Sequence, residues 1–120
     1  MQPTNKQICR EFSSGNFKFS YDYLSDDIQW NIVGDKILSG KDNVIEFCNK
    51  TAEYFSGVIT KFNIINLIEE DNCVAIDGTA EFINKENVTS NVSSCDLYNF
   101  KNNKIQSVTS YCITVNERGN

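Results

Sequence analysis

The sequence predicts a single soluble α+β domain in which about three helices cover one face of a strongly curved antiparallel sheet. The chain has 120 residues, of which 40% are hydrophobic and 22% charged, a composition typical of one globular core. Helical periodicity is confined to the first half, whereas the second half alternates as strands do. Helices and strands that are segregated along the chain are typical of the α+β class.

Three helices are expected in the first half. Residues 4–14 carry a weak helical pattern that ends before a glycine. Residues 17–24 fit either a helix or a strand, and periodicity alone leaves both open. Residues 39–55 give the clearest helix, with Ser39 as the expected cap and one apolar stripe formed by Val44, Phe47, Cys48, Ala52 and Phe55.

Strands are expected at residues 28–33 and then at four longer segments, namely 58–68, 73–83, 90–100 and 104–115. Segment 58–68 is apolar on both faces, with Ile59, Ile65 and Leu67 on the second face. A strand with one face in water would not show this pattern. The sequence therefore predicts a homodimer through the outer face of the sheet.

Composition excludes several function classes. The net charge is −5 and no run of Lys or Arg forms a basic patch, so neither a nucleic-acid partner nor a membrane surface is expected. No apolar run approaches the roughly 20 residues that span a bilayer. The five cysteines are single and odd in number, which favours reduced thiols and a cytoplasmic location.

The residue types that are missing narrow the chemistry further. The chain has no His, which removes the commonest general base and metal ligand. The cysteines lack paired spacing, and no phosphate loop or dinucleotide motif is present. We therefore expect no metal and no cofactor.

Asp96 is the residue that breaks its local pattern. It shares a predicted strand face with Val92, Tyr98 and Phe100. If that face is buried, desolvation raises the pKa of the carboxyl, as at many functional sites. If the strand lies at an edge or its register slips, Asp96 lies in water. The pattern alone leaves both interpretations open.

Three stretches, in order, suggest a family. Residues 24–30 (LSDDIQW), 40–47 (GKDNVIEF) and 96–105 (DLYNFKNNKI) resemble motifs of the nuclear transport factor two-like superfamily, in its SnoaL-like polyketide cyclase and ketosteroid isomerase branch. The resemblance implies one SnoaL-like domain over residues 1–120, with the cystatin-like α+β barrel fold. In that fold, a cone-shaped sheet surrounds a pocket and helices close it. It also implies a helix at residues 17–24 and a homodimer.

Only one of the three catalytic residues that the resemblance implies has a matching residue in this sequence. The pocket Asp of ketosteroid isomerase, which stays protonated and donates a hydrogen bond, falls on Asp96. The Asp base of that enzyme falls on Ile32, and its Tyr falls near Ile8. A steroid-isomerase mechanism is therefore not supported.

The resemblance also conflicts with hydrophobicity on the last strand. It turns Val108, Ser110 and Cys112 into the cone, whereas hydrophobicity would bury a different set, namely Tyr111, Ile113 and Val115. Both hold if the second set packs in a dimer interface.

These observations lead to one main hypothesis, a mostly apolar pocket that binds a small hydrophobic organic ligand. Asp96 is the candidate catalytic acid or hydrogen-bond donor, and Gly78 would leave space in the cone. The other candidate ligand-binding residues are Trp30, Ile32, Phe47, Tyr54, Ile76, Tyr98, Ser110 and Cys112. Any chemistry would be proton transfer, isomerisation or cyclisation. The alternative is a non-catalytic ligand-binding or dimerisation module on the same fold.

Overall fold

The computed structural model describes residues 2–115, which form three helices and one six-stranded sheet. The helices are α1 (Asn5–Ser13), the 3₁₀-helix η1 (Phe17–Tyr23) and α2 (Lys41–Phe55). The strands are β1 (Leu24–Ile32), β2 (Lys36–Ser39), β3 (Ile59–Glu70), β4 (Cys73–Ile83), β5 (Thr89–Lys101) and β6 (Lys104–Thr114). The predicted α+β class is confirmed.

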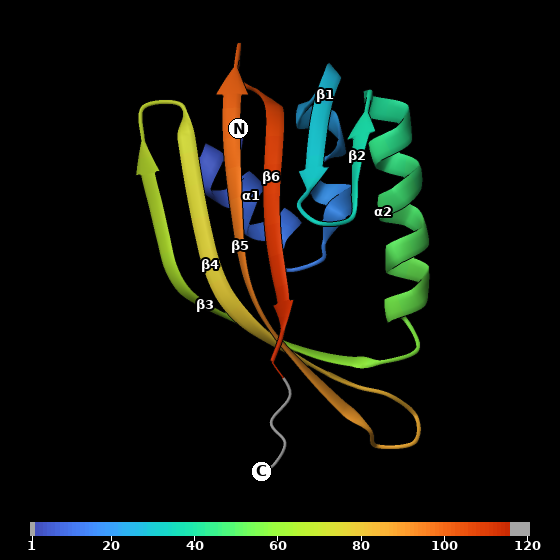
Figure 1. Ribbon diagram of the computed structural model, residues 1–120. Coiled ribbons are helices and arrows are strands. Elements are labelled where there is room, and N and C mark those ends of the chain that lie inside the picture. Colours follow the sequence, from blue (N-terminus) through green and yellow to red (C-terminus); the bar gives the residue numbers. More distant parts are fainter. Residues whose placement is uncertain (1, 116–120) are drawn as a thin grey trace.

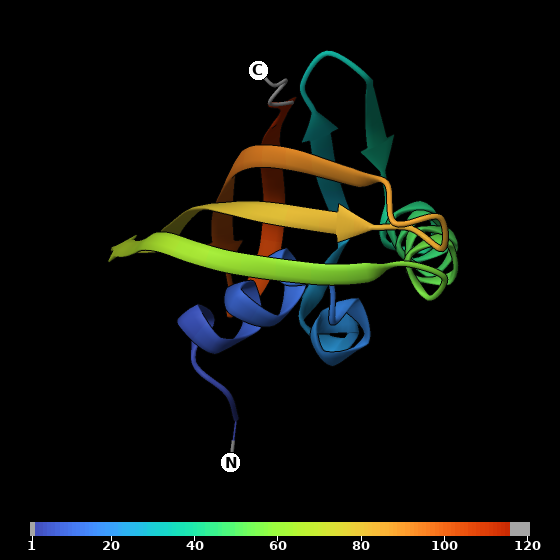
Figure 2. The same cartoon turned by 90° about the horizontal axis from the view of Figure 1, so that it is seen from below.

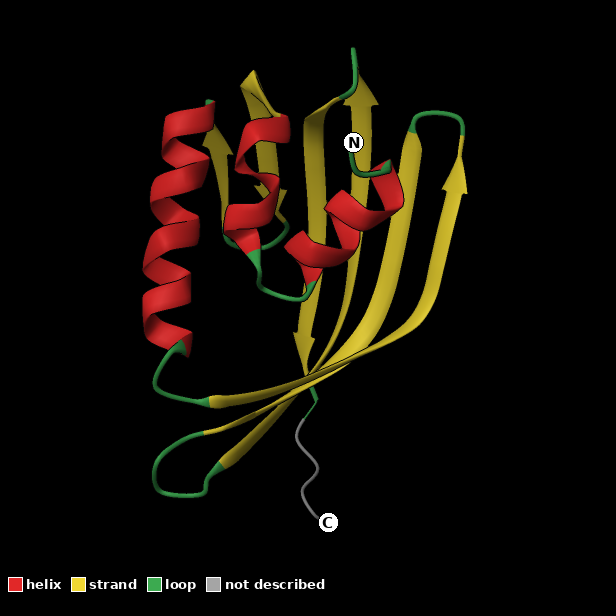
Figure 3. Cartoon of the chain, turned by 180° about the vertical axis from the view of Figure 1, so that it is seen from behind, coloured by secondary structure: helices red, strands yellow, loops and turns green. Residues whose placement is uncertain are grey.

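The sheet is curved, mixed and not closed. Its strand order is β2-β1-β6-β5-β4-β3, and every pair is antiparallel except β1 with β6, which is parallel. Strands β3, β4 and β5 bend sharply and sweep beneath the C-terminal end of α2 (Figure 1). Seen from below, the sheet curls around one side of the molecule (Figure 2). All three helices lie over its concave face (Figure 3).

The helices follow the prediction, with one correction. Thr4 caps α1 through a capping box with Gln7. The ambiguous segment after it is helical, as the family resemblance implies. Ser39 does not cap α2, because it lies in β2 and Gly40 occupies the cap position without a side-chain hydrogen bond.

Strand β2 was not predicted, and the reason is its length. It contains four residues, too few for an alternating pattern, and Ile37 at its centre is exposed. The turn between β5 and β6 consists of two asparagines. Asn102 and Asn103 there have φ angles of 55° and 65°, the left-handed conformation that a tight hairpin requires.

A bulge in β3 overturns part of the face assignment for that strand. The register shifts between Ile64 and Asn66, so the side chains beyond Ile65 exchange faces. Leu67, expected on the outer face, packs against the core, whereas Ile68 is 61% exposed. Ile65 lies on the surface, as predicted.

The core lies between the concave face of the sheet and the helices. Its buried members include Ile8, Phe12, Trp30, Val44, Ile76, Tyr98 and Val108. On β6, Val108 and Ser110 are buried, while Tyr111 and Ile113 are exposed, as is Val115 just after the strand. This is the orientation that the family resemblance implies. None of the helices in residues 2–115 has the length and apolar character needed to cross a bilayer.

Candidate functional site

A cavity of about 480 Å³ lies between the helices and the concave face of the sheet. Its walls come from α1 and the loop after it, from the start of η1, from α2, and from every strand except β2. The walls are mainly apolar and include seven aromatic rings, contributed by Phe12, Phe17, Trp30, Phe47, Phe55, Phe62 and Phe82. The stacked rings of Phe55 and Phe82, 4.8 Å apart, join α2 to β4 at one end.

Asp96 brings a carboxyl group to this cavity from β5. The Ser13 hydroxyl donates a hydrogen bond of 2.8 Å to Asp96 Oδ2, and Ser13 Oγ also lies 2.6 Å from Tyr98 Oη. A serine hydroxyl has a single proton, which here goes to Asp96. The buried Tyr98 hydroxyl is therefore the donor to Ser13.

A second set of donors reaches Asp96 from the other side. Trp30 Nε1 donates to Ser110 Oγ over 2.9 Å. Because an indole nitrogen can only donate, the Ser110 hydroxyl keeps its own proton for another acceptor. Ser110 is the cross-strand partner of Asp96 and hydrogen-bonds its carboxyl. Two serine hydroxyls thus donate to the same carboxyl group. Each of them in turn accepts a hydrogen bond from an aromatic side chain, Ser13 from Tyr98 and Ser110 from Trp30.

The pKa of Asp96 lies above its ordinary value of 3.8, mainly because burial removes the carboxyl from water. Hydrogen bonding by Ser110 and Ser13 acts in the opposite direction and does not cancel the effect. Asp96 is half-buried, since one side of the residue borders the cavity. This combination gives a carboxyl that is desolvated, hydrogen-bonded and accessible from the cavity.

The titratable groups around Asp96 are neutral at ordinary pH. Burial raises the pKa of the Tyr98 hydroxyl and of the Cys9, Cys95 and Cys112 thiols, and the charge of Asp96 adds to each shift. No Lys or Arg lines the cavity. Within residues 2–115, no cluster of His, Cys, Asp and Glu could hold a metal ion. Asp96 is therefore the one charged group on the described cavity wall.

Comparison with known proteins places this geometry in a family. No protein-family model and no curated protein matches the chain. A solved structure from Cytophaga hutchinsonii, described as an NTF2-like protein of unknown function, is 38% identical, with a TM-score of 0.79. The match covers 89% of this chain and 94% of that one. The chain belongs to the NTF2-like family.

More distant structures share the NTF2-like fold. A protein from Mesorhizobium loti described as a SnoaL-like polyketide cyclase is 16% identical, with a TM-score of 0.69 over 88% of this chain and 93% of that one. An LEH-like epoxide hydrolase of M. tuberculosis is 14% identical, with a TM-score of 0.66 over 92% and 85%. The predicted relationship to NTF2-like and SnoaL-like proteins is confirmed.

In this NTF2-like chain, six of the residues selected from the sequence line the cavity: Trp30, Ile32, Phe47, Asp96, Ser110 and Cys112. Two others, Ile76 and Tyr98, are fully buried in the core. Tyr98 nevertheless acts on the site through Ser13.

Gly78 has a different role from the one expected. It is absent from the cavity wall, and a Cβ placed there would lie 2.4 Å from the backbone oxygen of Asn63 on β3. Glycine at this position lets the bent strands approach each other instead of leaving room for a ligand.

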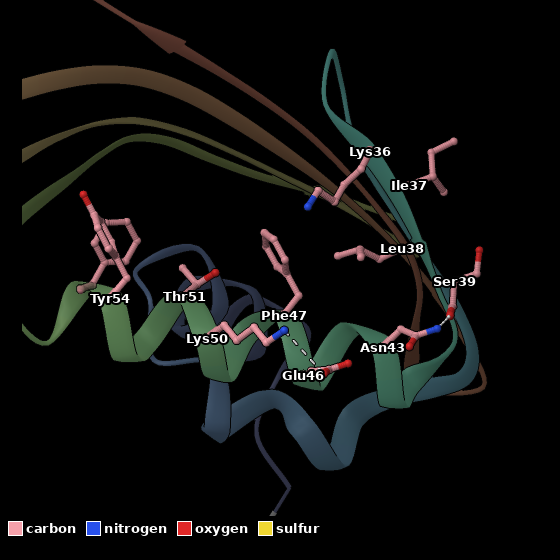
Figure 4. A pocket seen from close by; sticks show the side chains of 11 residues that line it. Lys36, Ile37, Leu38, Ser39, Asn43, Glu46, Phe47, Lys50, Thr51 and Tyr54 are labelled. Atoms are coloured by element: carbon pink, nitrogen blue, oxygen red, sulfur yellow. Dashed lines mark hydrogen bonds and ion pairs between the residues drawn. The ribbon is translucent and has the colours of Figure 1, made fainter.

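Tyr54 also lies outside the cavity, with 70% of its surface exposed. It borders a second hollow of about 610 Å³ between α2 and β2 (Figure 4). The Lys36 ammonium lies there 5.4 Å from the centre of the Phe47 ring, and Lys50 pairs with Glu46 at 3.6 Å. Phe47 borders both hollows, whereas Lys36 lines only the second one.

Ser13, the residue that links Asp96 to Tyr98, was not predicted from the sequence. Serine near the end of a helix ordinarily indicates only the helix terminus. Its contact with Asp96 spans 83 residues and depends on how α1 packs over the sheet. No local pattern could have indicated that contact.

Proposed function

We propose that this NTF2-like protein binds a small, largely apolar organic molecule in the concave cavity, with Asp96 as the polar contact. The observation that carries the proposal is a single desolvated carboxyl in a cavity walled by aromatic rings. A volume of about 480 Å³ suits one small molecule. A few polar groups in an otherwise apolar pocket are typical of ligand sites.

The only Trp of the chain provides the test. Trp30 is 7% exposed and lines the cavity, so a bound ligand should change its fluorescence. Neutral ligands such as naphthalene derivatives are titrated against the wild type and against Ala80→Phe, which fills the cavity. Ala75→Phe, on the same strand but outside the cavity wall, is the matched control. Saturable binding that Ala80→Phe alone abolishes supports the proposal, and equal behaviour of both variants contradicts it.

Proton transfer at Asp96 is a second candidate function. The serine hydroxyl protons point to its carboxyl, which suits a proton acceptor, and a raised pKa makes a carboxylate a stronger base. The names of the distant neighbours, a polyketide cyclase and an epoxide hydrolase, favour chemistry on small organic molecules. Sequence analysis suggested an acid or donor role for Asp96, whereas this network favours the base.

Deuterium exchange separates the two functions. A ketone with acidic C–H bonds, such as 2-tetralone, is incubated in D₂O and followed by NMR. Exchange that is faster with the wild type than with Asp96→Asn supports proton transfer. Binding without exchange supports the non-catalytic ligand-binding module.

Homodimerisation through the outer face of the sheet also remains our proposal. Ile59, Ile65, Tyr111 and Ile113 are all large apolar side chains that are exposed on β3 and β6. Apolar surface of this kind favours association with a second copy.

A cytoplasmic location is proposed from the cysteines. All five are free thiols in the structure, and Cys9 and Cys48 are buried. Mass spectrometry of the protein, alkylated in denaturant without reduction, should find five modified thiols, and a native disulfide would contradict the proposal.

A further inference from the structure

We propose that the cavity selects a small hydrophobic cation, such as a protonated amine, and that Asp96 is its counter-ion. This inference rests on the proposed ligand-binding function and adds the chemical class of the ligand. Three features carry it, namely the charge of the cavity wall, the directions of the hydrogen bonds around Asp96 and the aromatic surroundings.

The first feature is an unbalanced charge. Asp96 has no Lys or Arg beside it on the cavity wall. The titratable groups near Asp96 are Tyr98 and Cys95 on its own strand β5, Cys9 on α1 and Cys112 on β6. None of these groups carries positive charge. A buried carboxylate without a counter-ion is costly, so a cationic ligand that pairs with it gains the charge interaction that the protein omits.

The second feature is that the hydrogen-bond donors around Asp96 already have acceptors within the protein. Ser13 donates to Asp96, Tyr98 donates to Ser13, and Trp30 donates to Ser110. With Ser110 also directed at the carboxyl, the network leaves the ionised group as an acceptor. A carboxylate has about four acceptor positions, so an ammonium N–H can be added to the two serine donors. At Asp96 itself, a neutral carbonyl ligand could accept a hydrogen bond only from the protonated carboxyl.

The third feature is the aromatic wall. Phe12 lies edge-on to both Phe17 and Trp30, with ring centres 5.0 and 5.1 Å apart, and Trp30 lies edge-on to Phe47 at 5.4 Å. Such ring faces attract organic cations, more strongly where water is excluded. The Phe47 ring already attracts a cation, the Lys36 ammonium in the second hollow.

The experiment compares three ligands that share one ring system and differ in charge. They are 2-naphthylmethylamine, 2-naphthylmethanol and 2-naphthoate, each titrated by calorimetry near neutral pH. We expect the ammonium to bind at least about tenfold more tightly than the alcohol, and the carboxylate to bind least. Below the pKa of Asp96, the affinity of the ammonium should rise with pH, approaching about tenfold per pH unit, because binding requires the ionised carboxyl. The alcohol should lack this dependence.

Two variants with the same change in net charge identify the responsible carboxyl. Asp96→Asn should reduce the affinity for the ammonium to that of the alcohol. Asp77→Asn, on β4 and outside the cavity wall, should leave it unchanged. Equal loss in both variants would mean that only the overall negative charge attracts the amine, which overturns the inference.

Failure of this inference is distinguishable from failure of the proposed function. If the alcohol binds in the cavity as tightly as the ammonium, the cation inference is wrong and the ligand-binding function stands. If neither binds, the cation inference is also wrong, and the titration of neutral ligands against Ala80→Phe decides the proposed function separately.

Discussion

The Ser13 hydroxyl, at the last residue of α1, donates a 2.8 Å hydrogen bond to Asp96 Oδ2 on β5, 83 residues away. The same oxygen of Ser13 lies 2.6 Å from the hydroxyl of Tyr98, a residue with no exposed surface. Ser13 therefore couples the first helix to the carboxyl group of the cavity and to the buried hydroxyl of Tyr98.

Replacing Ser13 should destabilise the fold. Ser13→Ala removes the acceptor of the Tyr98 hydroxyl and leaves that buried group unpaired, which should lower the free energy of unfolding by about 1–3 kcal/mol. The neighbouring Ser14 is exposed and bonds only carbonyls of its own helix, so Ser14→Ala should change stability by less than about 0.5 kcal/mol. Urea denaturation measures both. Equal effects would show that the Ser13 contacts add no stability.

Asp96 should make stability depend on pH in a defined direction. Its folded pKa is raised above 3.8, so its favourable contribution is fully present below the unfolded pKa and is lost as pH rises through the folded pKa. Asp96→Asn lacks this titration and should be at least as stable as the wild type at neutral pH. Thermal melts between about pH 4 and pH 8 measure the difference. A clearly less stable Asp96→Asn at neutral pH would identify an ionised, structurally paired carboxylate instead.

Gly78 should tolerate no side chain. In Gly78→Ala, the new Cβ would lie 2.4 Å from the backbone oxygen of Asn63, so the strands must separate, at a cost of about 1–3 kcal/mol. Gly57→Ala is the matched control, because its Cβ would make an ordinary contact of 3.8 Å with Tyr54. Chemical denaturation of both variants tests the difference. Equal stabilities would contradict the close approach of β3 to β4.

The outer face of the sheet should mediate a homodimer. Ile65→Asp places a charge among the exposed apolar side chains of β3 and should convert a dimer to a monomer. Light scattering measures the mass of the protein in solution. At tens of micromolar protein, a dimer with a micromolar dissociation constant is populated. Asn63→Asp, also on β3 but at an exposed polar position, makes the same change in net charge and is the control. A wild-type mass equal to one chain would refute the dimer.

Local patterns predicted most of the fold because most of the elements are long and regular. The strand Cys73–Ile83 has the bounds that its alternation predicted. The prediction failed where one residue changes the register. The bulge at Ile65 moves Leu67 inward, and the periodicity of a strand contains no signal for an inserted residue.

Only the site residues that lie on strands could be predicted, because the alternating pattern shows which face of the sheet each of them occupies. Trp30, Asp96 and Ser110 share the concave face of neighbouring strands, so alternation and family resemblance together could select them. Ser13 could not be found in this way, because its contact depends on the packing of a helix. Tyr54 was placed wrongly because the apolar pattern of α2 does not show which of its two sides borders the cavity.

The pKa of the Asp96 carboxyl tests the account most directly. It can be followed by ¹³C NMR of the protein labelled at aspartate, with Asp96→Asn used to assign the resonance. We expect a midpoint above the ordinary value of 3.8, and a lower midpoint when 2-naphthylmethylamine is bound. A midpoint at or below 3.8 in the free protein would contradict the account, since Asp96 would then be a solvated or ion-paired carboxylate outside an apolar cavity.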